Sequence, residues 1–164
     1  TLSSSSAASD VYKRQRLIRR AAGAVLLAAA LSPVAQASPK QEAANKAAVL
    51  AFYEKGLNQK DADAALKYVG DRYVQHNPNA ADGPEGFRKF VAFLRDKFPK
   101  SHSEIKRVFT DGDYVILHVH AVREPGTRGN AIIDIFRLEQ GKIVEHWDAV
   151  QPIPEQSANT NGMF

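Results

Sequence analysis

The hydrophobic pattern of this chain changes its period once, at Pro99, and that change constrains the fold more than any other feature. Before Pro99, residues 83–98 carry apolar side chains at spacings of three and four, which indicates an amphipathic helix. That stripe consists of Phe87, Phe90, Val91, Leu94 and Phe98. After Pro99 apolar and polar residues alternate, as is typical of strands with one covered face. Helices followed by a run of antiparallel strands predict the α+β class.

Caps and turn signals predict the remaining elements. Two earlier helices are expected over residues 38–58 and 61–70, the second capped by Asp61, with a short strand over 72–76. The long strands are expected at 103–110, 114–123, 130–138 and 143–151. A strongly twisted sheet of this kind curls around the third helix and leaves a cavity between them.

The first part of the chain has the organisation of an export signal. Arg16, Arg19 and Arg20 precede an apolar run at 21–31, which is too short to span a bilayer. Small residues then surround Gln36, in the pattern of a cleavage site. We therefore expect a signal peptide over 16–37 and a periplasmic or secreted protein.

Three further segments complete the predicted organisation. Residues 1–15 resemble translated sequencing-adaptor sequence and are set aside from fold reasoning. One domain is expected over 38–154, followed by a flexible polar tail over 155–164.

Composition excludes several classes of function. Residues 38–164 carry equal numbers of basic and acidic side chains, so the predicted domain has no basic surface for nucleic acid. The chain has no cysteine, which excludes disulfides, thiolate catalysis and thiolate zinc sites. It contains no glycine-rich phosphate loop and no dinucleotide fingerprint, so no cofactor is expected. No membrane contact is expected after signal cleavage.

The turns predict which side chains share the cavity. If the loop between the second and third long strands is centred near Thr127, His120 lies opposite Asp134, and His118 and Phe136 share their face. If Gln140-Gly141 forms a two-residue turn, Trp147 also lies opposite Asp134. A bulge would slip this register by one residue and bring His146 and Asp148 to the cavity instead. We favour Trp147, because tryptophan suits a covered face.

Asp134 is the predicted catalytic residue. A carboxylate among apolar groups suits proton transfer next to a carbonyl, and His120 would assist it. The alternative is a structural pair in which His120 satisfies a buried Asp134. His118, His120 and Asp134 could also supply three metal ligands, but no helix signature supports a metal and none is predicted.

Seven further residues are predicted to bind substrate. They are Tyr53, Gln75, His76, Asn77, His118, Phe136 and Trp147. Simpler roles remain open for some of them: Asn77-Pro78 is also a natural turn, and Tyr53 and Trp147 are also natural core residues.

Two groups of motifs resemble one family. They are Tyr73-Val-Gln-His-Asn-Pro78 with Gly83-Pro-Glu-Gly-Phe87, and Asp134-Ile-Phe-Arg137 with Gly141-Lys-Ile-Val-Glu-His-Trp-Asp148. Over residues 43–154 the sequence resembles the SnoaL-like (polyketide cyclase-like) branch of the NTF2-like superfamily. The resemblance implies a conical α+β barrel, in which a strongly curved antiparallel sheet wraps around helices and encloses a deep pocket.

The resemblance also implies roles for individual residues. In the polyketide-cyclase members an aspartate acts as general acid and base, assisted by a histidine on the preceding strand, and Asp134 and His120 match those positions. Related epoxide hydrolases use an Asp-Arg-Asp set. Ile132 and Ala149 occupy the positions expected to face Asp134, so this set is predicted to be absent.

The function expected from these observations is acid/base chemistry, of the aldol cyclisation or isomerisation type, on a small apolar or carbonyl-containing molecule. One alternative is binding of an apolar ligand without reaction. Another is a dimerisation module whose outer face would carry Leu117, Val119, Ile133 and Ile135. A homodimer is expected in any case.

Overall fold

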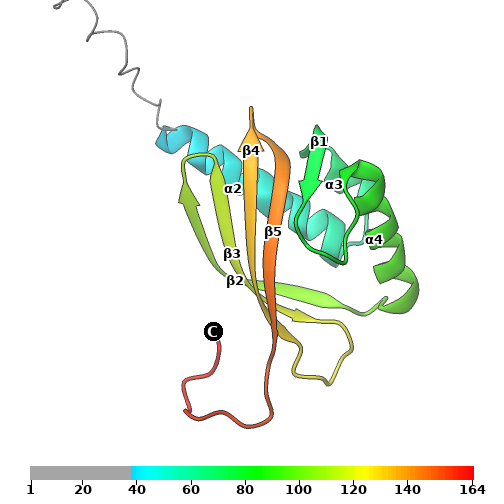
Figure 1. Ribbon diagram of the computed structural model, residues 1–164, viewed down its shortest axis with the longest axis vertical. Helices are drawn as coiled ribbons and strands as arrows, with labels where there is room; N and C mark the ends of the chain where they lie inside the picture. Colours follow the sequence, from blue (N-terminus) through cyan, green and yellow to red (C-terminus); the bar gives the residue numbers. More distant parts are fainter. Residues whose placement is uncertain (1–37) are drawn as a thin grey trace, which may run out of the picture. The chain divides into compact units, whose positions relative to one another are not determined.

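The computed structural model describes residues 38–164, drawn as the coloured ribbon in Figure 1. The predicted signal peptide over 16–37 and the adaptor-like segment over 1–15 lie outside the described residues. No helix among the residues described is long and apolar enough to cross a membrane.

The first two helices each begin at a capping residue, and Asp61 is the one that was predicted. Helix α2, Pro39–Tyr53, begins at Ser38, whose side chain accepts a hydrogen bond from the Gln41 backbone N–H. Helix α3, Ala62–Leu66, begins in the same way at Asp61, which accepts from the Ala64 N–H. Between them, the expected single helix over 38–58 changes to a π-helix, η1, at Glu54–Asn58.

The third long helix, α4, spans Gly83–Lys97 and carries the predicted apolar stripe. Phe87, Val91 and Leu94 are buried on it. Its approach to η1 depends on Gly56, because a Cβ atom there would lie 2.6 Å from Cζ of Phe87. Glycine at this position therefore lets the π-helix and α4 meet.

The sheet has five strands in the order β1-β5-β4-β3-β2. They are β1 (Val69–Gln75), β2 (His102–Asp111), β3 (Tyr114–Val122), β4 (Asn130–Glu139) and β5 (Lys142–Pro152). Strands β2 to β5 form an antiparallel meander, and β1 pairs with β5 in parallel. The sheet is curved and unclosed, and α2 crosses one of its faces (Figure 1). The predicted fold class is confirmed.

The core lies between the helices and the inner face of the sheet, which is the face that the helices cover. Phe52 of α2 packs against Phe87 of α4 and Phe136 of β4, with ring centroids 4.8 and 5.8 Å apart. Strand β3 contributes Val115, Leu117 and Val119, which are fully buried. Leu117 and Val119 were expected on the outer face, and that expectation is wrong.

The loop between β3 and β4 explains why the β3 side chains point to the faces opposite to those expected. Leu117, not His120, lies opposite Asp134, and His120 lies opposite Ala131. The centre of the hairpin lies near Pro125 and Gly126, which is earlier than the Thr127 centre expected. The resulting slip is an odd number of residues, so every β3 side chain changes face.

The hairpin between β4 and β5 contains a bulge, which was the less favoured of the two expected registers. Glu139 pairs with Lys142, as a two-residue turn requires, but Arg137 pairs with Glu145. Val144 is therefore the extra residue, and it is buried next to buried Ile143. Beyond the bulge Asp148 lies opposite Asp134, so Trp147 points to the outer face and the favoured register is wrong.

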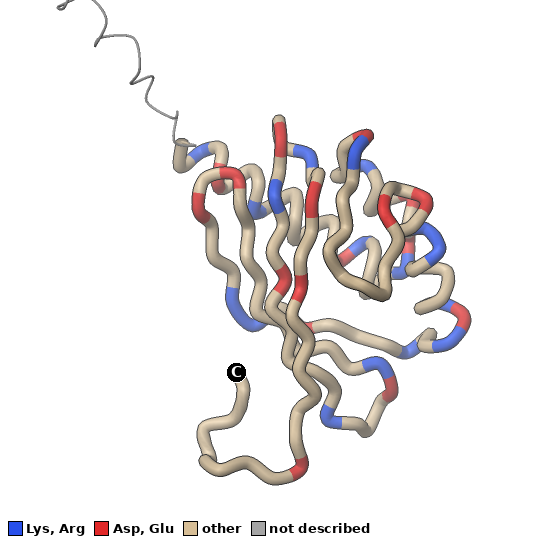
Figure 2. Tube along the Cα trace, in the orientation of Figure 1, with Lys and Arg blue, Asp and Glu red and all other residues tan. Residues whose placement is uncertain are grey.

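The residues after β5 return to the outer face of the sheet. This stretch carries a single charged side chain, Glu155, near its start (Figure 2). The Phe164 ring ends against His118 and His120, with centroids 5.1 and 4.9 Å away. Flexibility of the tail stays a prediction, but its last residue covers part of the sheet.

Phe52 tests the packing between the helices and the sheet. Phe52→Ala is expected to lower the free energy of unfolding by about 3–5 kcal/mol, because the side chain is 2% exposed and contacts two rings. Phe93→Ala is the matched control on α4, where the side chain is 47% exposed, and is expected to cost less than about 1 kcal/mol. Urea denaturation measures both; equal losses would contradict this account of the core.

Candidate functional site

A cavity of about 310 Å³ lies between the inner face of the sheet and the helices. Most of its wall is apolar, with Phe52, Leu57, Phe87 and Phe136 among the lining residues. A small set of polar side chains converges at one end, from α2, the end of β1, β4 and β5. An apolar cavity with few, grouped polar residues is typical of a site for a small organic molecule.

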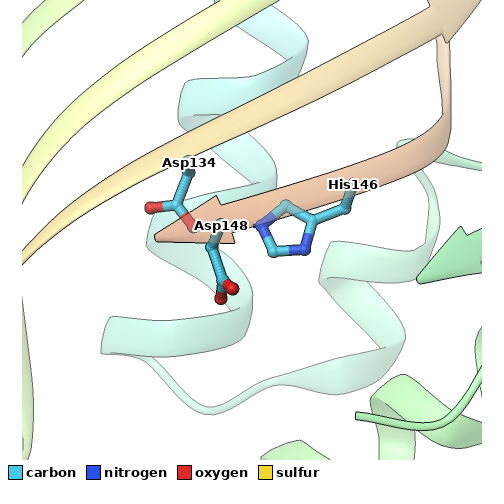
Figure 3. Close-up of side chains that lie close together, drawn as sticks. All are labelled: Asp134, His146 and Asp148. Carbon is cyan, nitrogen blue, oxygen red and sulfur yellow. Dashed lines mark hydrogen bonds and ion pairs between the residues drawn. The ribbon is translucent and has the colours of Figure 1, made fainter. Parts of the chain in front are cut away.

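Asp134 is the centre of the polar group. Its side chain is 6% exposed and accepts a hydrogen bond from the Tyr53 hydroxyl on Oδ2, at 3.1 Å. Its other oxygen, Oδ1, lies 3.0 Å from Nε2 of His146. Figure 3 shows the Asp134, His146 and Asp148 side chains gathered where β4 and β5 run side by side. Two partners therefore satisfy a carboxylate that burial alone would strongly disfavour.

Gln75 determines which nitrogen of His146 carries a proton. Oε1 of Gln75 accepts from the backbone N–H of Asn77, which can only donate, and this fixes the orientation of the amide. The same Oε1 lies 2.7 Å from Nδ1 of His146, so Nδ1 must donate to it. Nε2, the other ring nitrogen, then faces Oδ1 of Asp134.

Asp148 is held close to this pair by Asn77. The Asn77 side-chain amide donates to both Asp148 oxygens, at 2.9 and 2.7 Å. Ligand atoms of Asp134, His146 and Asp148 all lie within 4.8 Å of one another. These three residues could hold a metal ion, but each already has a hydrogen-bonding partner among the described side chains.

Burial and the nearby carboxylate change the ionisation of two tyrosines. Desolvation, followed by the charge of Asp134 and the hydrogen bond to it, raises the pKa of Tyr53 well above its usual range. Desolvation likewise raises the pKa of Tyr73, which also lines the cavity. Both phenols therefore keep their protons at physiological pH.

The cavity contains some of the predicted site residues. Asp134, Tyr53, Gln75, Asn77 and Phe136 line it. Their proposed catalytic and substrate-binding roles stay predictions.

Four predicted site residues do not line the cavity. His120 lies on the outer face, where Nε2 donates to the Arg128 carbonyl oxygen at 2.8 Å. His118 is also on the outer face, because both residues follow the reversed parity of β3. Trp147 lies on the outer face because of the Val144 bulge. The His76 ring stacks on the Trp147 ring, with centroids 4.6 Å apart, and its Nε2 contacts Glu145.

His146 and Asp148 replace them in the cavity. The signal that could have identified them is the apolar pair Ile143-Val144 directly after the Gln140-Gly141 turn, since two consecutive buried residues in a strand indicate a bulge. The expected absence of an Asp-Arg-Asp set is corrected in part. Asp148, and not Ala149, lies opposite Asp134, whereas Ile132, the other position considered for the set, is not an arginine.

Comparisons with known proteins agree with this class of fold. The family model of the SnoaL-like domain matches residues 49–146. No curated protein matches the chain. Because the family model covers more than half of the sequence, the chain belongs to the SnoaL-like family.

Solved structures share the same architecture at low sequence identity. A SnoaL-like polyketide cyclase from Agrobacterium tumefaciens is 17% identical, with 65% of this chain and 91% of that chain covered and a TM-score of 0.55. An NTF2-like protein of unknown function from Cytophaga hutchinsonii is 20% identical, with 66% and 90% covered and a TM-score of 0.54. An uncharacterized cystatin fold protein from Novosphingobium aromaticivorans is 24% identical, with 64% and 97% covered and a TM-score of 0.56. These similarities establish the fold.

The raised pKa of Tyr53 predicts a particular loss of stability in alkali. Unfolded tyrosine ionises near pH 10, whereas folded Tyr53 keeps its proton, so the free energy of unfolding falls as pH rises above about 10 and is unaffected below it. Tyr53→Phe should reduce this fall by about 1.4 kcal/mol per pH unit. Urea denaturation between pH 8 and 11 measures it, with exposed Tyr114→Phe as control. An unchanged alkaline slope in Tyr53→Phe would contradict the assignment.

Proposed function

We propose that this protein catalyses cofactor-independent proton transfer on a small carbonyl compound, of the aldol cyclisation or isomerisation type. The observation that carries the proposal is the pair formed by Asp134 and His146 at the polar end of an apolar cavity. Asp134 is the general base, as expected from the sequence, and His146 takes the assisting role that the sequence assigned to His120.

The hydrogen bonds around Asp134 support this role. The carboxylate removes a proton from the carbon next to the carbonyl, and the proton is then held between Asp134 and His146. Gln75 keeps the imidazole oriented through Nδ1, so Nε2 stays directed at the carboxylate throughout. Tyr53, whose raised pKa keeps it protonated, stabilises the charged form of Asp134 between turnovers.

The surroundings of the pair favour chemistry on an apolar molecule. Aromatic and aliphatic residues form most of the wall, which excludes water from a developing enolate. Asp148 lies near enough to contact the same substrate and is held by Asn77 as a second acceptor. Two carboxylates in different hydrogen-bonding environments can divide the acid and base roles.

Exchange of carbon-bound hydrogen tests the proposal even when the natural substrate and product are not identified. Asp134→Asn and His146→Gln should each slow the exchange of α-hydrogens for deuterium in small aryl ketones and β-diketones by about 10²–10⁴-fold. Nuclear magnetic resonance in heavy water measures the rate, and circular dichroism checks that the variants fold.

The matched control is His120→Gln, on the outer face of the sheet, which should exchange at the parent rate. Saturable binding of these compounds with no exchange above the buffer rate by the parent protein would favour binding without reaction. Parent-like exchange by Asp134→Asn would exclude Asp134 as the base.

We also propose that the protein is exported and forms a homodimer through the outer face of its sheet. Three large side chains of that face are exposed, namely Phe109 (56%), Tyr114 (40%) and Ile133 (41%). Neighbouring Ile116 and Ile135 extend the apolar surface. An apolar sheet face of this kind is stabilised when a second copy covers it.

Charge introduced into this face tests the dimer. Ile133→Glu should convert the dimer into a monomer in light scattering at micromolar concentration, because an unpaired carboxylate cannot be buried in an apolar interface. Phe93→Glu, at an exposed position of α4, is the control and should leave the mass unchanged. A monomeric parent protein would refute the dimer.

A further inference from the structure

The cavity has a second polar end that the proposed reaction does not use. Ser101, His102, Ser103, Arg123 and Asn130 line it there. Ala121 of β3 pairs with both Ser103 and Asn130, which brings the ends of β2, β3 and β4 together. Asn130 lies four residues before Asp134 on β4, or roughly 13 Å of strand from the carboxylate pair.

Among the residues that the structure describes, Arg123 is the only lysine or arginine that lines the cavity. Its guanidinium lies over the rings of Phe90 and Phe98, with distances of 5.7 and 5.4 Å to the centroids. Across residues 38–164, no carboxylate forms an ion pair with it. Desolvation lowers the pKa of Arg123, yet a guanidinium remains charged at neutral pH. Arg123 lines the cavity and is also exposed to solvent, and it is therefore an oriented cation without an anion beside it.

Ser101 is a second polar group without a partner at the same end. Its hydroxyl oxygen is buried and makes no hydrogen bond within the described part of the chain. His102 and Val122 form the last pair of β2 and β3, so Ser101 and Arg123 each lie one residue beyond that pair. A buried hydroxyl without a partner is costly, and an acceptor bound in the cavity would satisfy it.

The carboxylates at the other end determine which way a charged ligand would lie. Asp134 and Asp148 disfavour an anionic group near them, whereas Arg123 attracts one. The apolar wall between the two ends contains Phe87 and Phe90, which suits an aromatic or aliphatic body. The two ends thus favour a single orientation of an amphipathic molecule.

We propose that the cavity binds a small apolar carboxylate, whose anionic group contacts Arg123 and Ser101 and whose body extends toward Asp134. This proposal names the class of ligand for the proposed function, and it rests on that function only for the position of the reacting atoms. Arg123 is then a residue that determines specificity for the ligand's charge. Recognition of the carboxylate does not require turnover and can be measured separately.

Matched pairs of ligands test the proposal. Isothermal titration calorimetry compares benzoate, 2-naphthoate and 4-phenylbenzoate with the corresponding carboxamides, which have the same shape and no charge. At least one carboxylate should bind the parent protein about tenfold more tightly than its carboxamide. Arg123→Gln should abolish that preference and leave the affinity for the carboxamide unchanged.

Two further variants distinguish recognition from general electrostatics. Arg128→Gln, on the loop that follows β3, removes the same charge outside the cavity and should retain the preference. Ser101→Ala should weaken carboxylate binding about threefold without lowering stability, because it removes a hydroxyl that has no partner.

Absence of a carboxylate preference in all three pairs would overturn the proposal. So would an equal loss in Arg128→Gln and Arg123→Gln. Neither result depends on hydrogen exchange. The assignment of Asp134 as the base is therefore tested separately, by the exchange experiment.

Discussion

The hydrogen-bonded pair of Asp134 and His146 is the interaction on which the organisation of the cavity depends. An isolated carboxylate in an apolar interior would cost several kcal/mol, so this one requires donors from other elements. Helix α2 supplies the Tyr53 hydroxyl, β5 supplies the imidazole, and the end of β1 supplies Gln75 to orient that imidazole. The carboxylate thereby ties one helix and three strands to a single arrangement, and two other features of the fold follow from it.

One of these features is the bulge at Val144. Without it, Trp147 would face Asp134, and neither His146 nor Asp148 could enter the cavity, since neighbouring strand residues point to opposite faces. The other feature is the π-helix η1, which begins directly after Tyr53. Such insertions in regular elements are common near functional sites, where they change the direction of a side chain. Both irregularities here lie next to residues that contact Asp134.

The sequence was sufficient for most of the elements and for the presence of Asp134 in the cavity, but not for the residues that contact Asp134. Periodicity and caps predicted α4, the start of α2 and the four long strands, because these follow from local interactions. Asp134 was predicted because a charged residue in an apolar strand is informative by itself. Its partners depend on pairing between strands, and a shift of one or three residues there changes the face of every side chain. The loop at Pro125 and the bulge at Val144 each introduced such a shift, which is why His120 and Trp147 were assigned to the wrong face.

The polarity of the cavity adds a constraint that the fold alone does not supply. A SnoaL-like fold can host different chemistries, so function must be argued from the residues in its cavity. Here Asp148 lies opposite Asp134, but neither carboxylate has an arginine among its partners in the described residues. The arginine that lines this cavity is Arg123, at the opposite end. The positive charge of the cavity thus lies away from the aspartates, and Asp134 is bonded instead to the His146 imidazole and the Tyr53 hydroxyl. In the function proposed here, proton transfer takes place at one end of the cavity and an anionic group is bound at the other.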